Sequence, residues 1–182
     1  MKFVVHDASI LIDLALSKSV EAWFATGVET WTTNLIYPSE IVKAEQRVVY
    51  DAYVTAKKLK IKALTPHELE ELVRTRAKLS MGLSLADVSA LSLTKTLGPD
   101  AVLATGDRLL RKTADRERVK ACGILKLFDV MVEGTKEHPA ILPPTLAIEK
   151  LRGLMQLPEC RLPSDRCDEK IKAWSRKGPA SR

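Results

Sequence analysis

Apolar and polar positions recur along this chain with two different periods, and each period predicts a different element. Alternation with a period of two, and short β-branched runs, are typical of strands, whereas apolar residues three and four positions apart indicate helices. The strands expected on this basis are residues 2–6, 28–33, 61–64, 101–104 and 119–121. Helices are expected over residues 10–15, 20–24, 38–44, 50–58 and 124–132, and from residues 65, 84 and 108 onward. Such alternation favours an α/β fold in which a parallel sheet is covered by helices on both faces.

Local signals mark where two of these helices begin and end. Thr65 and Pro66 suit a helix start, because threonine caps free N–H groups and proline is tolerated in the first turn. Ser84, followed three residues later by Asp87, resembles a capping box. Gly98 is expected to stop the helix that Ser84 opens.

The last part of the chain has a different pattern. Residues 138–144 are rich in proline and are expected to connect elements. Two helices are then expected, one over residues 145–157 and one from residue 162 onward. We therefore divide the chain into a domain over residues 1–135 and a helical extension over residues 136–182, which packs on the domain or on a partner.

The composition narrows the class of protein without choosing a function. The chain has 182 residues, of which 46% are hydrophobic and 29% are charged, as in ordinary globular proteins. Its net charge of +6 either attracts a polyanion or simply reflects a charged, solvated surface. The chain has three cysteines, an odd number, and they lack the closely spaced pairs typical of zinc ligands. This argues against a disulfide framework or a zinc site. No apolar run reaches the roughly 20 residues of a membrane span, and a signal-peptide pattern is absent, so we expect a cytoplasmic protein.

Four carboxylates stand at expected element boundaries. Asp7 follows the first expected strand, Asp87 opens a helix, and Asp107 follows the fourth expected strand. A proline-serine pair predicts a further helix start, which places Glu40 in the first turn of that helix. Each acid has a structural alternative. Asp7 and Asp87 suit helix caps, Glu40 suits the helix dipole, and Asp107 suits a turn.

The combination of these acids points to metal chemistry. In open parallel sheets, ligands bind beyond the carboxyl ends of the strands. Carboxylates gathered there would raise one another's pKa values unless a cation neutralised them, and Mg²⁺ and Mn²⁺ prefer such oxygen ligands. Thr105 would orient a carboxylate by hydrogen bonding, and Gly106 would allow close backbone approach. Weaker candidates are Asp13, Asp51, Asp100, Asp115 and Asp129.

The ordered set of motifs resembles a PIN-domain nuclease. The residues that support this are Asp7-Ala8-Ser9 after a strand, Glu40 early in a helix, Asp87 opening an apolar helix, and Thr105-Gly106-Asp107 after a strand. The resemblance covers roughly residues 1–133 and implies a three-layer α/β/α fold with a parallel central sheet. It also implies a Mg²⁺- or Mn²⁺-dependent ribonuclease. Its acidic site would consist of Asp7, Glu40, Asp87 and Asp107, supported by Ser9 and Thr105.

Many small proteins of this family are VapC-type toxins. The resemblance therefore further implies RNA as the substrate, a cognate antitoxin as a partner, and a homodimer. The chain departs from the most compact toxins by its extension after roughly residue 138. The basic helix expected from residue 108 would hold the RNA backbone near the acids, or would simply form a solvated face.

Two other functions compete with a metal-dependent nuclease. A phosphatase of the haloacid-dehalogenase type, with Asp7 as nucleophile, needs a second aspartate two residues later, where this chain has Ser9. A non-catalytic nucleic-acid- or protein-binding module on the same fold would be expected to have lost at least one of the four acids. The nuclease is therefore the preferred hypothesis.

Overall fold

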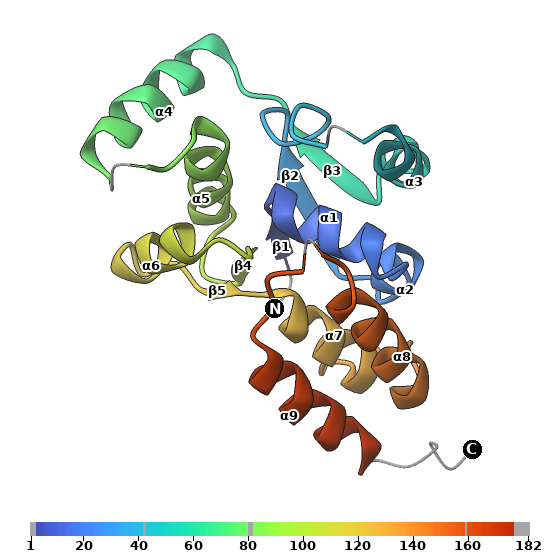
Figure 1. The fold of residues 1–182 in the computed structure, drawn as a ribbon. Helices are drawn as coiled ribbons and strands as arrows, with labels where there is room; N and C mark the ends of the chain where they lie inside the picture. The colour runs from blue at the N-terminus through green and yellow to red at the C-terminus, as the bar shows by residue number, and fades with distance from the viewer. Residues whose placement is uncertain (1–2, 42, 80–81, 159, 177–182) are drawn as a thin grey trace.

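A five-stranded parallel sheet forms the centre of the molecule (Figure 1). The computed structural model describes residues 3–41, 43–79, 82–158 and 160–176. The strands are β1 (Phe3–His6), β2 (Glu29–Thr33), β3 (Leu59–Lys62), β4 (Ala101–Ala104) and β5 (Ala121–Cys122). Their order across the sheet is β3-β2-β1-β4-β5, and each neighbouring pair is parallel. The predicted parallel sheet is confirmed.

The first strand lies in the middle of the sheet, and this placement decides where a site can form. Val5 pairs with Trp31 of β2 on one side and with Leu103 of β4 on the other. From β1 the chain moves outward through β2 and β3, and then returns to the far side of β1 as β4. The strand order therefore reverses between β1 and β4. Open α/β sheets bind their ligands beside such a reversal, beyond the carboxyl ends of the strands.

Helices cover both faces of the sheet and give the molecule three layers (Figure 1). One layer consists of α1 (Ala8–Leu16), α2 (Val20–Ala25), α3 (Ala44–Thr55) and α7 (Ile124–Glu133). The other consists of α4 (Pro66–Lys78), α5 (Leu85–Leu97) and α6 (Arg108–Arg116). In this second layer α5 packs directly on β1, β2 and β4. The predicted three-layer α/β/α fold is correct.

Two helices at the C-terminal end continue from α7. They are α8 (Pro144–Met155), which packs on α7, and α9 (Ser164–Ser175), which packs on α8. Trp174 of α9 is buried in the same apolar core as the sheet. Lys170 Nζ of α9 donates to Asp129 Oδ2 of α7 at 2.6 Å. The division into residues 1–135 and 136–182 stays a prediction, and the apolar core is continuous across it.

The helix predicted over residues 38–44 is wrong, and so is the predicted position of Glu40. Residues 34–40 form consecutive turns after β2, and the next helix begins only at Ala44. That helix, α3, also takes in most of the stretch predicted separately over residues 50–58. Val42, which the prediction placed in the first of these helices, lies outside the described residues.

Local hydrogen bonds explain why these turns replace a helix. The Ser39 hydroxyl donates to the Asn34 carbonyl at 3.1 Å and so does not cap a following helix. Pro38 has no N–H with which to extend a helical ladder. The Glu40 N–H donates to the Ile36 carbonyl at 2.8 Å, which closes a turn directly after the end of β2. Glu40 therefore lies at the carboxyl end of a strand that neighbours β1.

Smaller corrections concern two strands. β3 begins at Leu59, two residues before the predicted start. The Val119 N–H donates to the Ala114 carbonyl at 2.8 Å, which prolongs the end of α6 and delays the start of β5.

The helices of the protein are short. The longest described helices, α4 and α5, have 13 residues each. Within the described residues, none combines the length and the apolar character that a membrane crossing requires.

Candidate active site

Asp7 lies at the carboxyl end of the central strand, beside the reversal of strand order. Its N–H donates to the Ala104 carbonyl at 3.0 Å, so it extends the pairing of β1 with β4 by one residue. The side chain caps α1, because Oδ1 accepts from the Ala8 N–H at 2.7 Å. Asp7 is only 4% exposed, and carboxylates are rarely so buried. The structural alternative of a cap is thus correct, and it uses one of the two oxygens.

Two hydroxyl groups hold the other oxygen of Asp7. Asp7 Oδ2 accepts from Thr105 Oγ1 at 2.8 Å and from Ser9 Oγ at 3.0 Å. Ser9 Oγ in turn accepts from the Gly106 N–H at 2.8 Å. A Cβ atom on Gly106 would lie 3.1 Å from Ser9 Oγ, so glycine permits this close approach. The network fixes the Asp7 carboxylate through residues that are 98 positions apart in the sequence.

Asp87 is held at the start of α5. Its Oδ2 accepts from the Ser84 N–H at 2.7 Å, and its own N–H donates to Ser84 Oγ at 3.0 Å. This is the capping box that the sequence predicts. Nearby, the hydroxyls of Thr33 at the end of β2 and Ser89 of α5 share a buried hydrogen bond of 2.7 Å. That bond fixes the first turns of α5 against the sheet and thereby positions Asp87.

Negative charge links Asp7, Glu40 and Asp87, and we call these three residues the acidic cluster. Burial raises the pKa of Asp7, and the charge of Asp87 raises it further, while the hydrogen bonds from Thr105, Ser9 and the backbone oppose the rise. Burial also raises the pKa of Glu40, followed by the charges of Asp7 and Asp87. The carboxyls of Asp7 and Glu40 therefore resist ionisation, and a cation beside them would relieve that resistance.

Asp107 stands apart from the acidic cluster. It is exposed and caps α6, because Oδ1 accepts from the Leu110 N–H at 2.7 Å. The structural role expected for it was a turn, and the structure shows a helix cap. Its N–H donates to Thr105 Oγ1 at 3.0 Å, and this hydroxyl is its link to Asp7. The structure thus joins three of the four predicted acids by charge and leaves the fourth at the edge.

Among the weaker candidate acids, three have other surroundings. Asp129 pairs with Lys170, and Asp51 accepts a hydrogen bond from the Tyr37 hydroxyl. Burial alone raises the pKa of Asp13 to about 6. Asp13 is therefore a half-buried acid whose pKa is not raised by another carboxylate, which makes it a natural control for the acidic cluster.

The donor set at this end of the sheet fits a hard divalent cation. Its candidate ligands are carboxylate oxygens, the donors that Mg²⁺ and Mn²⁺ prefer. Asp87 and Asp107 each commit one oxygen to a cap, and a carboxylate can accept about four hydrogen bonds, so lone pairs remain. Within the described residues, no three acidic, histidine or cysteine side chains are grouped closely enough to hold a metal alone. Mg²⁺ commonly binds one or two carboxylates and takes its other ligands from water and phosphate, so the set still fits.

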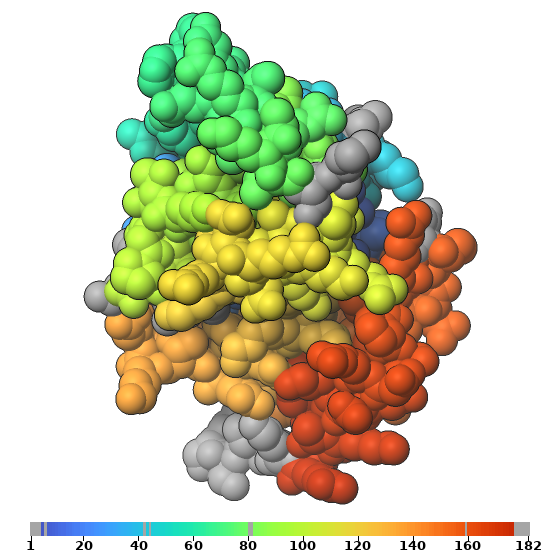
Figure 2. Space-filling model, turned by 90° about the vertical axis from the view of Figure 1, so that its left-hand side faces the viewer, coloured from blue at the N-terminus to red at the C-terminus, as the bar shows by residue number. Residues whose placement is uncertain are grey.

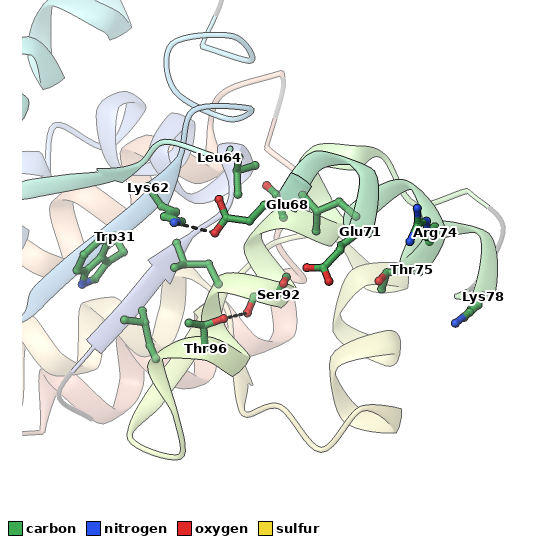
Figure 3. A pocket seen from close by; sticks show the side chains of 14 residues that line it. Trp31, Lys62, Leu64, Glu68, Glu71, Arg74, Thr75, Lys78, Ser92 and Thr96 are labelled. Carbon is green, nitrogen blue, oxygen red and sulfur yellow. Dashed lines mark hydrogen bonds and ion pairs between the residues drawn. The ribbon is translucent and has the colours of Figure 1, made fainter. Parts of the chain in front are cut away.

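A cavity of about 580 Å³ opens elsewhere, between the β2–β3 side of the sheet and helices α4 and α5 (Figure 3). None of the four predicted acids lines it. Two of its charged residues form an ion pair, since Lys62 Nζ lies 2.8 Å from Glu68 Oε1 (Figure 3). This cavity therefore gives no reason to move the candidate site away from the carboxyl ends of β1 and β4.

The sequence did not predict a role for one residue at the edge of the site, Arg111. Arg111 Nη2 donates to the Thr105 carbonyl at 2.6 Å, so the residue that orients Asp7 also holds a guanidinium group. A Cβ atom on Gly123 would lie 2.8 Å from this nitrogen. The sequence indicates a basic helix here, but it does not single out Arg111, because the glycine that admits its side chain belongs to another element.

Comparison with known proteins gives one family. A family model described as a PIN domain matches residues 3–175. The match spans the sheet, the acidic cluster and both C-terminal helices, so α8 and α9 fall within the pattern of the family. The chain has no match among curated proteins.

Proposed function

This chain belongs to the PIN-domain family, whose members are generally nucleases, and on that premise we propose that it is a metal-dependent endoribonuclease that hydrolyses RNA phosphodiester bonds. The observation that supports this proposal best is the setting of Asp7. Two hydroxyl groups orient its carboxylate at the reversal of strand order, and Glu40 and Asp87 add negative charge beside it. Such a site attracts a divalent cation.

The proposed residues divide into ligands and supports. Asp7, Glu40, Asp87 and Asp107 would hold Mg²⁺ or Mn²⁺. When bound, the ion would position the phosphate, activate water and stabilise the leaving oxygen. Thr105 and Ser9 orient the Asp7 carboxylate, so that it meets the ion without reorganising. Asp107 keeps its backbone fixed through the Thr105 hydroxyl.

A toxin role is a further part of the proposal. It rests on the resemblance to VapC-type toxins, and it includes a cognate antitoxin and a homodimer as partners. Exposed Val48 and Val49 on α3 offer apolar surface to a partner chain. A small reading frame for an antitoxin beside this one would support the toxin role, and a monomer in light scattering would contradict the dimer.

The alternative is a non-catalytic module on the same fold that binds nucleic acid or protein. It predicts that no RNA is cut under any metal condition. Retention of all four acids argues against it, because carboxylates that bind no cation cost stability where they are buried.

The test is RNA cleavage with a matched pair of aspartate substitutions. Mixed-sequence RNA oligonucleotides are incubated with the protein in Mn²⁺, in Mg²⁺ and in EDTA. Asp7→Asn removes the charge but keeps the helix cap, because asparagine caps as well as aspartate. We expect this variant to cut at least about 100-fold more slowly. The control Asp13→Asn makes the same chemical change on the same helix and should cut at the normal rate.

Three outcomes would overturn the metal-carboxylate mechanism. The first is cutting that persists in EDTA. The second is cutting by Asp7→Asn at the wild-type rate, and the third is an equal loss of cutting in both variants. Thermal melts of each variant separate a folding defect from a lost function.

A further inference from the structure

A second hollow is lined by Arg111, which is hydrogen-bonded to Thr105, and we call this hollow the basic groove. Its volume is about 510 Å³, and it lies between α6 and the segment that leads into β5. Its lining includes four cationic side chains and one acidic side chain, Arg108, Arg111, Lys112, Lys120 and Asp115. Figure 2 shows α6 lying open across the middle of one face of the molecule, with α4 on the same face.

The cations of the groove are not neutralised by the protein. Among the described residues, none of the four forms an ion pair, with Asp115 or with any other carboxylate. Lys120 Nζ donates to the Pro99 carbonyl at 2.9 Å, which holds the side chain without reducing its charge. All four side chains are exposed. The groove is therefore a concave surface with excess positive charge, which attracts a polyanion.

The cavity of Figure 3 offers a useful contrast, because it has a similar volume and also contains cations. There Lys62 lies 2.8 Å from Glu68, and Arg74 lies 3.7 Å from Glu70. Two of its three cations are thus paired with acids, so it has less attraction for a polyanion than the basic groove. Excess charge, not volume, distinguishes the basic groove.

Arg111 connects the basic groove to the acidic cluster. Its Nη2 donates to the Thr105 carbonyl at 2.6 Å, while the Thr105 hydroxyl donates to Asp7 at 2.8 Å. The guanidinium group lies against Gly123, where a Cβ atom would come within 2.8 Å of it. An arginine has five N–H donors, so one backbone bond leaves most of them for another acceptor. The side chain is therefore anchored and still able to bind phosphate in a bidentate manner.

We propose that the basic groove binds the phosphates of the RNA strand, and that Arg111 fixes the strand relative to Asp7. The inference rests on the proposed function for the identity of the strand. Its geometry rests on the groove itself. The phosphate next to the site of cutting lies beside Arg111. Arg108 and Lys112 on α6, and Lys120 on the segment before β5, hold the neighbouring backbone.

Binding of RNA without cutting tests this assignment. The anisotropy of a labelled, mixed-sequence, single-stranded RNA is measured with Asp7→Asn protein in EDTA, at several salt concentrations. Adding Arg111→Met should weaken binding about tenfold and lower the salt dependence by about 0.7 in log–log slope, as expected for one lost phosphate contact. Arg74→Met, which removes an arginine from α4 on the same face, should change the Kd less than about twofold.

A second variant separates position from charge. Gly123→Ala keeps every cation but displaces the Arg111 guanidinium, and the backbone at Gly123 has φ −111°, which alanine adopts readily. We expect affinity to fall a few-fold with the salt slope unchanged. The RNA affinity of Arg111→Lys should lie between that of the wild type and that of Arg111→Met, because lysine keeps the charge but lacks the planar guanidinium group that binds phosphate in a bidentate manner.

Three results would overturn the assignment. These are equal effects of Arg111→Met and Arg74→Met, an unchanged salt slope in Arg111→Met, or a polyglutamate peptide that needs Arg111 while RNA does not. Failure of the proposed function gives a different pattern. If RNA binds as predicted but is never cut, the nuclease proposal fails and the groove assignment stands.

Discussion

The acidic cluster and the basic groove are both hydrogen-bonded to Thr105 and are built in different ways. The cluster draws Asp7 from the end of β1, Glu40 from a turn after β2 and Asp87 from α5. The groove comes from a single stretch, residues 108–121. Thr105 serves both, with its hydroxyl on Asp7 and its carbonyl on Arg111. One residue therefore sets the distance between the place where a cation would bind and the place where a phosphate would bind.

The two regions also differ in what their charges cost. Burial and mutual repulsion raise the pKa values of Asp7 and Glu40, so the acidic cluster lowers the stability of the free protein. The cations of the groove are exposed and solvated, and their removal costs little stability. Substitutions in the cluster should therefore alter cleavage and stability together, whereas substitutions in the groove should alter RNA binding, and cleavage through it, with little change in stability.

The largest expected effect is a difference in cleavage rate between substitutions in the two capping boxes, those of α5 and α4. Asp87→Asn should slow cleavage about 100-fold or more, because its charge belongs to the acidic cluster. Glu68→Gln alters the capping box of α4, where Thr65 is the cap, and should leave cleavage unchanged. Both changes should lower stability by about 1 kcal/mol or less. Cleavage rates and urea melts of the two variants measure this, and equal rates would remove Asp87 from the proposed site.

The next effect concerns the residue that the two regions share. Thr105→Val removes a hydrogen bond that lowers the pKa of Asp7, so that pKa should rise further. Cleavage at pH 7 should fall about tenfold, and the acidic limb of the pH–rate profile should move to higher pH. The control is Thr113→Val, because the buried Thr113 hydroxyl has no hydrogen-bond partner among the described residues. That variant should be as active and at least as stable, and a matching loss of activity in it would contradict the role of Thr105.

A smaller effect should appear in stability against pH. A carboxyl whose pKa is raised in the folded protein binds more protons folded than unfolded, so stability falls as pH rises through the window above its ordinary pKa. Asp7 and Glu40 have raised pKa values and should cause such a fall above roughly pH 4. A bound cation offsets the fall. The rise in Tm caused by Mn²⁺ should therefore be a few degrees at pH 8 and close to zero at pH 4, and a rise that is the same at both pH values would contradict it.

The smallest expected effect is that of the control acid. Burial alone raises the pKa of Asp13 to about 6. The loss of folding stability caused by ionising this carboxyl therefore develops between about pH 4 and pH 6, and it is fully present above pH 6. Asp13→Asn should stabilise the protein on the order of 1 kcal/mol at pH 7.5 and hardly at pH 4. The Tm rise caused by Mn²⁺ should remain as in the wild type. Loss of that rise would show that Asp13 takes part in cation binding.

Several features of this protein could be predicted from neighbouring residues alone. The alternation of strands and helices, the capping box at Ser84, the helix start at Thr65 and the position of Asp7 after a strand all proved correct. Each depends on periodicity or on hydrogen bonds that span a few residues, so the signal is complete within a short stretch. The predicted position of Glu40 in the first turn of a helix was wrong, because two local preferences competed there. The turn closed by the hydrogen bond from Ser39 to Asn34 formed in place of a helix start.

Only the tertiary structure decided which of the site residues become neighbours. The placement of β1 between β2 and β4 brings Thr105 to Asp7, joins Glu40 and Asp87 to them by charge, and leaves Asp107 at the edge. The seating of Arg111 against Gly123 depends likewise on a contact between separate elements. The sequence by itself determined the fold class and the identity of the acids. It could not determine their grouping, because strand order is selected by the packing of the whole core and by loops that close over long distances, and no short stretch contains that information.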